Sequence, residues 1–254
     1  MKQIPNLFTL LNLVFGCIAI VCILQTGEAI VYTDATGFTT VNMPEKIAMG
    51  SLFIFAAALV DFLDGFVARL FKATSEMGKQ LDSLADVVSF GVAPGLILYQ
   101  LLRISFAREI DGLDVSMIAL APAFLLPCAA AWRLAKFNLD SSQQYSFKGL
   151  PTPAAGITVA AFPLIIHYQQ LNLHELLLNK WLLYGIIVLL SYLMVSNLPL
   201  LSLKFRDNSL KNNLPKYILA GIAIVAAIFL KWVAIPVVFL AYVIVSLAFK
   251  NKIA

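Results

Sequence analysis

Four aspartates stand close together in two otherwise apolar stretches, Asp61 and Asp64 in the first and Asp82 and Asp86 in the second. An ionised carboxylate is costly in apolar surroundings, so such residues usually pair with cations, coordinate metal ions or line a wet cavity. The spacings i, i+3 and i, i+4 place each pair on one face of a helix. If the two helices form a hairpin, all four carboxylates can meet, and their repulsion must be balanced.

The cations near these aspartates are few. Arg69, Lys72 and Lys79 lie toward the polar link between the two helices rather than beside Asp61 and Asp86. We therefore expect divalent metal ions as the counter-charge. Ligation by carboxylates alone suits Mg²⁺ or Mn²⁺ and offers zinc or copper no soft ligand. Four carboxylates would use two such ions well, typically about 3.5–4 Å apart.

Small residues accompany the aspartates at helical spacing. Gly65 and Ala68 continue the face of the first pair, and Gly78 precedes Asp82 by one helical turn. Their small side chains leave a slot beside the expected metal ions. A nucleotide diphosphate would fit this slot, and its oxygens would complete the coordination.

The complete pattern resembles the signature of the CDP-alcohol phosphotransferase family, membrane enzymes that displace CMP from a CDP-linked lipid with an alcohol. The eight matching positions, which span 26 residues, are Asp61, Asp64, Gly65, Ala68, Arg69, Gly78, Asp82 and Asp86. So many fixed positions make the match far more specific than any one pair within it. The alternative is that the aspartates are salt-bridged structural carboxylates in a helix bundle, and the specificity of the match disfavours it.

The resemblance implies a role for each signature residue. The metal ligands would be Asp61, Asp64, Asp82 and Asp86. The CDP part of the substrate would contact Asp64, Gly65, Ala68, Arg69, Gly78 and Asp82. Asp86 would also act as the catalytic base toward the acceptor hydroxyl.

Composition places the chain among multi-pass membrane proteins. It is 61% hydrophobic and 13% charged, with a mean hydropathy of +0.88, which is far more apolar than a soluble domain. We expect an all-α bundle that forms a single integral membrane domain over residues 1–254. The three cysteines, Cys17, Cys22 and Cys128, lie in apolar runs without metal-ligand spacing and are predicted to be packing residues.

A membrane-spanning helix needs about 20 largely apolar residues. Eight stretches qualify approximately: 6–25, 46–70, 80–103, 115–137, 152–171, 177–200, 214–231 and 233–249. Lys231 and Trp232 leave almost no turn before the eighth, in which Pro236 suits the start. Pro94 is expected to kink the third helix one to two turns beyond Asp86.

Charge indicates the orientation of the chain. Eight spans place both termini on one side, together with the link between the aspartate helices and most of the 18 Lys and Arg residues. By the positive-inside rule, we expect the termini and the active site to face the cytoplasm, in a membrane of the bacterial inner-membrane type.

Two further segments, residues 4–12 and 131–156, resemble the phosphatidylserine synthase branch of the family. In the first, Asn6, Thr9 and Asn12 share a helical face and could hydrogen-bond the aspartate helices or the nucleotide. The second contains the run Arg-Leu-Ala-Lys-Phe-Asn and then Gly-Leu-Pro-Thr-Pro. It departs from the branch at Lys136, where arginine is usual, so the bidentate fork of a guanidinium is lost there.

The serine acceptor is a zwitterion, so its carboxylate needs a cation or N–H donors. Arg133, Lys136 and Asn138 form the nearest unassigned polar cluster on the expected face and are predicted to bind the acceptor. The alternative for these residues, above all for Lys136, is anchoring to lipid headgroups.

The predicted reaction is transfer of a phosphatidyl group from CDP-diacylglycerol to L-serine, giving phosphatidylserine and CMP. Two alternatives stay open: another acceptor, glycerol phosphate or inositol phosphate, or a cation- or proton-coupled transporter. A phosphorylated acceptor would call for a denser cationic pocket, and a transporter for acidic residues spread along a path. Membrane lipids are expected partners, nucleic acid is not, and the resemblance implies a homodimer.

Overall fold

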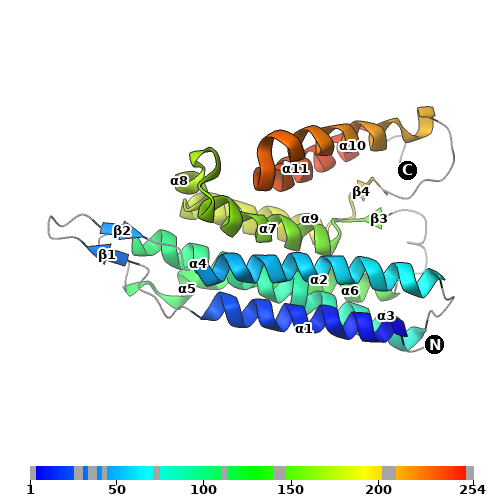
Figure 1. Ribbon diagram of the computed structural model, residues 1–254, viewed down its shortest axis with the longest axis horizontal. Coiled ribbons are helices and arrows are strands. Elements are labelled where there is room, and N and C mark those ends of the chain that lie inside the picture. The colour runs from blue at the N-terminus through cyan, green and yellow to red at the C-terminus, as the bar shows by residue number, and fades with distance from the viewer. Residues whose placement is uncertain are drawn as a thin grey trace.

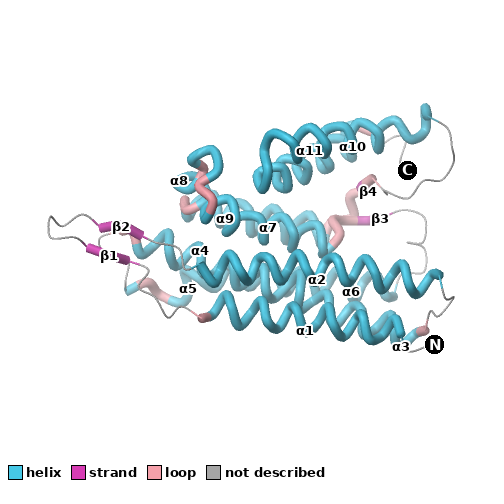
Figure 2. Tube along the Cα trace, viewed as in Figure 1, coloured by secondary structure: helices cyan, strands magenta, loops and turns pink. Residues whose placement is uncertain are grey.

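Apolar helices form most of the structure, a computed structural model (Figures 1 and 2). It describes residues 4–25, 31–33, 39–41, 45–70, 75–109, 114–139, 147–201 and 210–249. The α-helices are α1 Ile4–Leu24, α2 Glu45–Leu70, α3 Glu76–Asp86, α4 Ala93–Ala107, α5 Met117–Leu120, α6 Leu125–Leu139, α7 Thr152–His167, α8 His174–Leu177, α9 Lys180–Val195, α10 Leu210–Leu230 and α11 Ala234–Ala248.

Short irregular elements connect these helices. A π-helix, η1 (Val87–Val92), joins α3 to α4, and the 3-10 turns are η3 Ala121–Phe124, η5 Gln170–Asn172 and η6 Lys231–Val233. Two antiparallel ribbons complete the described chain: β1 Val31–Thr33 with β2 Thr39–Val41, and β3 Phe147–Lys148 with β4 Pro199–Leu200.

The predicted all-α membrane fold is confirmed. Within the described residues, five helical stretches are long and apolar enough to cross a membrane: Pro5–Leu24, Lys46–Leu70, Glu76–Ala107, Met117–Leu139 and Asn213–Ala248. The apolar helices α7 and α9 are shorter, with 16 residues each. The last long stretch contains both α10 and α11, which turn at Lys231, a residue with a φ of 49°. A helix thus overlaps each of the eight predicted stretches.

The helices lie side by side and nearly lengthwise (Figure 1). Packing continues from α1 to α2, from α2 to α7, and from α7 to α11, with α10 outermost. The start of α1, the end of α2 and the start of α3 lie at one end of the bundle, and the β1–β2 ribbon lies at the other. The first end therefore gathers the signature residues.

The third predicted span runs without a break from Glu76 to Ala107. Where a kink was expected at Pro94, the structure has the π-helix η1: the helix widens directly before the proline, and the N–H of Ala93 bonds to the carbonyl of Val88. Pro94 then occupies the first turn of α4, where its missing N–H does no harm. Such π-turns are rare and often found at functional sites.

Neighbouring helices approach η1 closely because they present glycine there. A Cβ added to Gly156 of α7 would lie 2.9 Å from the Phe90 backbone, and one added to Gly16 of α1 would lie 2.4 Å from the Ser89 hydroxyl. Phe90 is fully buried in the core. The backbone that follows the aspartates is therefore held from two sides.

Candidate active site

Three of the four aspartates meet between α2 and α3. Asp61 and Asp64 come from the last turns of α2 and Asp82 from α3, and one carboxylate oxygen of each lies within 4.8 Å of the others. Asp64 is buried, whereas Asp61 and Asp82 are half-buried. Their mutual closeness is the geometry expected from the i, i+3 and i, i+4 spacing.

Asp86, the last residue of α3, lies deeper in the bundle and is only 6% exposed. Its charge interacts with those of Asp61, Asp64 and Asp82 and, with opposite sign, with that of Arg133. The four carboxylates thus form one electrostatic group, although the tight three-membered set does not include Asp86.

Helix α1 contacts the aspartates on both motif helices. The hydroxyl of Thr9 lies 2.7 Å from Oδ2 of Asp64, and the amide of Asn12 donates to Oδ1 of Asp86 at 3.5 Å. The predicted face of Asn6, Thr9 and Asn12 is therefore turned to the aspartate helices in this structure.

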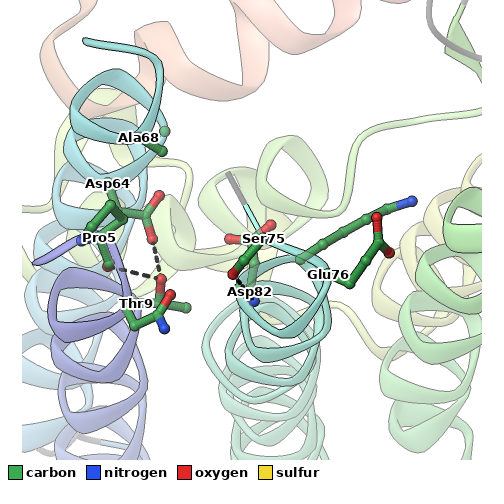
Figure 3. Close-up of a pocket in the computed structure, with 11 residues that line it drawn as sticks. Pro5, Thr9, Asp64, Ala68, Ser75, Glu76 and Asp82 are labelled. Carbon is green, nitrogen blue, oxygen red and sulfur yellow. Dashed lines mark hydrogen bonds between the residues drawn. The ribbon is translucent and has the colours of Figure 1, made fainter. Parts of the chain in front are cut away.

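A cavity of about 510 Å³ opens beside the cluster (Figure 3). In the close-up, Thr9 and Asp64 stand on one side, while Ser75 and Asp82 stand on the other. Its lining residues are Pro5, Asn6, Thr9, Asp64, Gly65, Ala68, Ser75, Glu76, Gly78, Lys79 and Asp82. A Cβ added to Gly65 would meet nothing within 4 Å, so the backbone is open to a ligand there.

The first turn of α3 forms one wall of this cavity. Ser75 caps the helix by accepting a hydrogen bond from the N–H of Gly78 at 3.0 Å. The amino end of a helix carries unpaired N–H groups and a partial positive charge, which favour a phosphate. Sequence reasoning did not single out Ser75, although a serine directly before a helix is a recognised N-cap signal.

The predicted CDP-contacting residues mostly line the cavity. Those that do are Asp64, Gly65, Ala68, Gly78 and Asp82. Arg69 is exposed near the end of α2 and is not part of the lining. Lys72, expected in the link, lies outside the described residues.

The three predicted acceptor residues lie on α6 and do not line this cavity. Arg133 is buried and donates from Nη1 to the Thr152 hydroxyl at 3.0 Å, while its Nε has no hydrogen-bond partner. The other two engage protein groups. Lys136 donates to Oδ1 of Asn197 at 2.6 Å, and the Asn138 amide donates to the Ser83 hydroxyl at 2.8 Å.

The sequence model of one family, CDP-alcohol phosphatidyltransferase, matches residues 2–195 of the chain. The chain belongs to this family. The match covers α1 to α9 and therefore all signature residues, whereas the α10–α11 hairpin lies beyond it.

Proteins similar to this chain include two bacterial proteins named CDP-diacylglycerol–serine O-phosphatidyltransferase. The protein of Helicobacter pylori strain J99 is 37% identical over 199 residues, which are 76% of this chain and 70% of the relative. The protein of Bacillus subtilis strain 168 is 30% identical over 185 residues, which are 71% of this chain and 89% of the relative.

Proposed function

We propose that this protein transfers the phosphatidyl group of CDP-diacylglycerol to the hydroxyl of L-serine, giving phosphatidylserine and CMP, with divalent metal ions at the carboxylate cluster. The observation that carries the proposal is the convergence of Asp61, Asp64 and Asp82 at the edge of an open cavity. The names of the relatives support serine as the acceptor.

The carboxylate cluster fits divalent metal ions. Among the described residues, the ion pairs join Glu175 to Arg108 and, when the imidazole is protonated, to His174, and Lys180 to Glu109; none includes these aspartates. Asp61, Asp64, Asp82 and Asp86 would hold Mg²⁺ or Mn²⁺ through oxygen alone, as these ions prefer. When bound, the metal would neutralise the pyrophosphate oxygens and make the phosphorus easier to attack.

The cavity lining would bind the CMP part of the substrate. Gly65 permits close approach of the ligand to α2, and the amino end of α3, where Gly78 also lines the cavity, offers N–H donors to a phosphate. These contacts would fix the lipid-linked phosphorus next to the cluster. Correct placement by itself supplies a large part of a transfer reaction's acceleration.

Asp86 is the residue we assign as base. In the reaction, the serine oxygen forms a bond to the phosphorus of the phosphatidyl group as the phosphorus–oxygen bond to CMP breaks. A carboxylate oxygen of Asp86 takes the hydroxyl proton. Because a carboxylate is a weak base toward an alcohol, the proton leaves late, once the new bond has begun to form.

Arg133 is the acceptor residue that the arrangement favours most. Its guanidinium is buried, its charge interacts with that of Asp86, and its Nε is without a partner. It would bind the serine carboxylate beside the base. Lys136 and Asn138 donate to protein groups, so a serine contact by either would require those bonds to change.

The active site would face the cytoplasm, where serine is available. The Lys and Arg distribution supports this orientation, with both termini and the α2–α3 link on the same side. The diacylglycerol part would stay in the membrane while the pyrophosphate reaches the end of the bundle. By family resemblance, the protein would be a homodimer.

CMP release by the purified protein from CDP-diacylglycerol tests the proposal. We expect release with L-serine and Mg²⁺ or Mn²⁺, none after metal chelation, and little with glycerol phosphate or inositol phosphate. Release with one of these phosphorylated alcohols but not with serine would change the acceptor. If no alcohol supports CMP release, the proposed transferase activity is contradicted and the transporter alternative is favoured.

A further inference from the structure

Helix α1 is the element that packs along both aspartate-bearing helices. It contacts α2 and α3 extensively, whereas direct packing of α2 on α3 is slight within the described residues. Gly50 of α2 abuts Ile23 of α1, and Gly78 of α3 abuts Asn6. The distance between the two pairs of aspartates is therefore set largely through a third helix.

Thr9 makes the closer of two polar contacts from α1. It is 4% exposed, and its hydroxyl lies 2.7 Å from Oδ2 of Asp64 and 3.2 Å from the carbonyl of Pro5. A hydroxyl has one proton to donate, and hydrogen bonds to a charged acceptor are shorter and stronger. The distances thus favour donation to Asp64, which fixes one oxygen of that carboxylate.

Asn12 makes the second contact, one helical turn further along the same face. It is fully buried, and its amide lies 3.5 Å from Oδ1 of Asp86. The backbone carbonyl of Asn12 accepts a hydrogen bond from the hydroxyl of Ser89 in η1 at 3.1 Å. Asn12 is therefore held to the same backbone segment that carries Asp86.

We propose that α1 orients the carboxylates of the active site, with Thr9 as the positioning residue for Asp64 and Asn12 as the positioning residue for Asp86. Neither would touch the reacting atoms; each holds one carboxylate in the orientation that metal binding and catalysis need. The inference rests on the proposed function, because it gives these carboxylates that task.

Thr9 gives the sharper test because its hydroxyl can be removed without a large change in shape. Thr9→Val removes the hydroxyl that donates to Oδ2 of Asp64 and leaves the Asp64 carboxylate less firmly oriented. Loss of such a supporting hydrogen bond usually costs 10–100-fold in metal affinity. We expect roughly a tenfold weaker affinity for Mn²⁺, and Thr9→Ser, which keeps the hydroxyl, should stay within about threefold of the unchanged protein.

Thr158→Val is the matched control. Thr158 of α7 is also 4% exposed, its hydroxyl donates to the carbonyl of Ala154 at 2.7 Å, and it is not part of the cavity lining. Manganese binding to each purified protein would be measured by electron paramagnetic resonance of free Mn²⁺. CMP release, resolved into kcat, the KM for CDP-diacylglycerol and the metal activation constant, would be measured in parallel.

The inference predicts that Thr9→Val weakens Mn²⁺ binding, raises the metal activation constant and lowers kcat, with a smaller change in the KM for CDP-diacylglycerol. Equal Mn²⁺ affinity in the Thr9→Val and Thr158→Val proteins would overturn it. If Thr9→Val does not fold, Thr9→Ala serves in its place with the same two outcomes. Lack of Mn²⁺ binding by the unchanged protein would instead overturn the proposed function.

Discussion

The four aspartates differ in their surroundings. Asp64 and Asp86 are each 6% exposed and accept hydrogen bonds from α1, whereas Asp61 and Asp82 are half-buried at the edge of the group. Replacing either buried carboxylate removes the charged acceptor of the hydrogen bond from Thr9 or Asn12. Substitution of Asp64 or Asp86 is therefore expected to lower stability as well as activity, and Asp61 is the better position for a test of chemistry.

Arg133→Ala tests the acceptor assignment at the level of one side chain. Removing the guanidinium should raise the KM for serine by roughly tenfold or more, the effect of one lost charge-assisted hydrogen bond, with a smaller effect on the KM for CDP-diacylglycerol. Steady-state CMP release with each substrate varied in turn measures both constants.

Arg103→Ala is the control for that substitution. Arg103 is exposed on α4 and donates to the Gln100 side chain at 3.2 Å, outside the cavity lining. It should leave both KM values within about twofold. Equal increases in the two KM values for Arg133→Ala would count against a serine contact.

The π-helix η1 packs directly against α7 at Gly156. A Cβ at Gly156 would lie 2.9 Å from backbone atoms of Phe90, which cannot give way as a flexible side chain would. Overpacking of this kind typically costs about 1–3 kcal/mol. Gly156→Ala should therefore lower the melting temperature of the purified protein and, by shifting η1, its activity.

Gly185→Ala is the matched comparison on α9, because a Cβ there would meet nothing within 4 Å. It should leave the melting temperature unchanged or raise it slightly, since alanine is the better helix former. Equal melting temperatures for the two variants would argue against close packing of α7 on η1.

Ion pairs connect the helices at the end away from the active site. Arg108, after α4, donates to both oxygens of Glu175 on α8 at 2.5 and 2.6 Å, and Lys180 of α9 pairs with Glu109. The hydrogen bond from Arg108 holds the pKa of Glu175 below its ordinary value of 4.5. Glu175 is largely exposed, so screening by water keeps the contribution small.

Glu175→Gln should lower the melting temperature by about 1–3 °C near neutral pH, as for loss of an exposed pair. Because the folded-state pKa is lowered, the stabilisation is complete above the ordinary pKa of 4.5 and is lost as the pH falls through the lowered value. Thermal unfolding at several pH values measures this. A difference that persists in strongly acidic buffer would contradict the ion pair as its cause.

For the whole molecule, periodicity and apolar length predicted the helical stretches, and the spacing of Asp61, Asp64, Asp82 and Asp86 predicted their closeness. Sequence could not reveal η1, because whether Pro94 kinks a helix or widens it depends on the neighbours that pack there. Nor could it show that Lys136 reaches Asn197, a residue 61 positions away. Contacts between distant segments depend on tertiary packing rather than on local pattern.

The shared carboxylate site is tested most directly by CMP release from the Asp61→Asn protein. Asparagine keeps the shape of the side chain but removes one charge from a group assembled by α1, α2 and α3. We predict a protein that melts near the temperature of the unchanged one yet releases no measurable CMP from CDP-diacylglycerol and serine, even in excess Mg²⁺ or Mn²⁺. Substantial CMP release by this folded variant would contradict a metal site built from these aspartates.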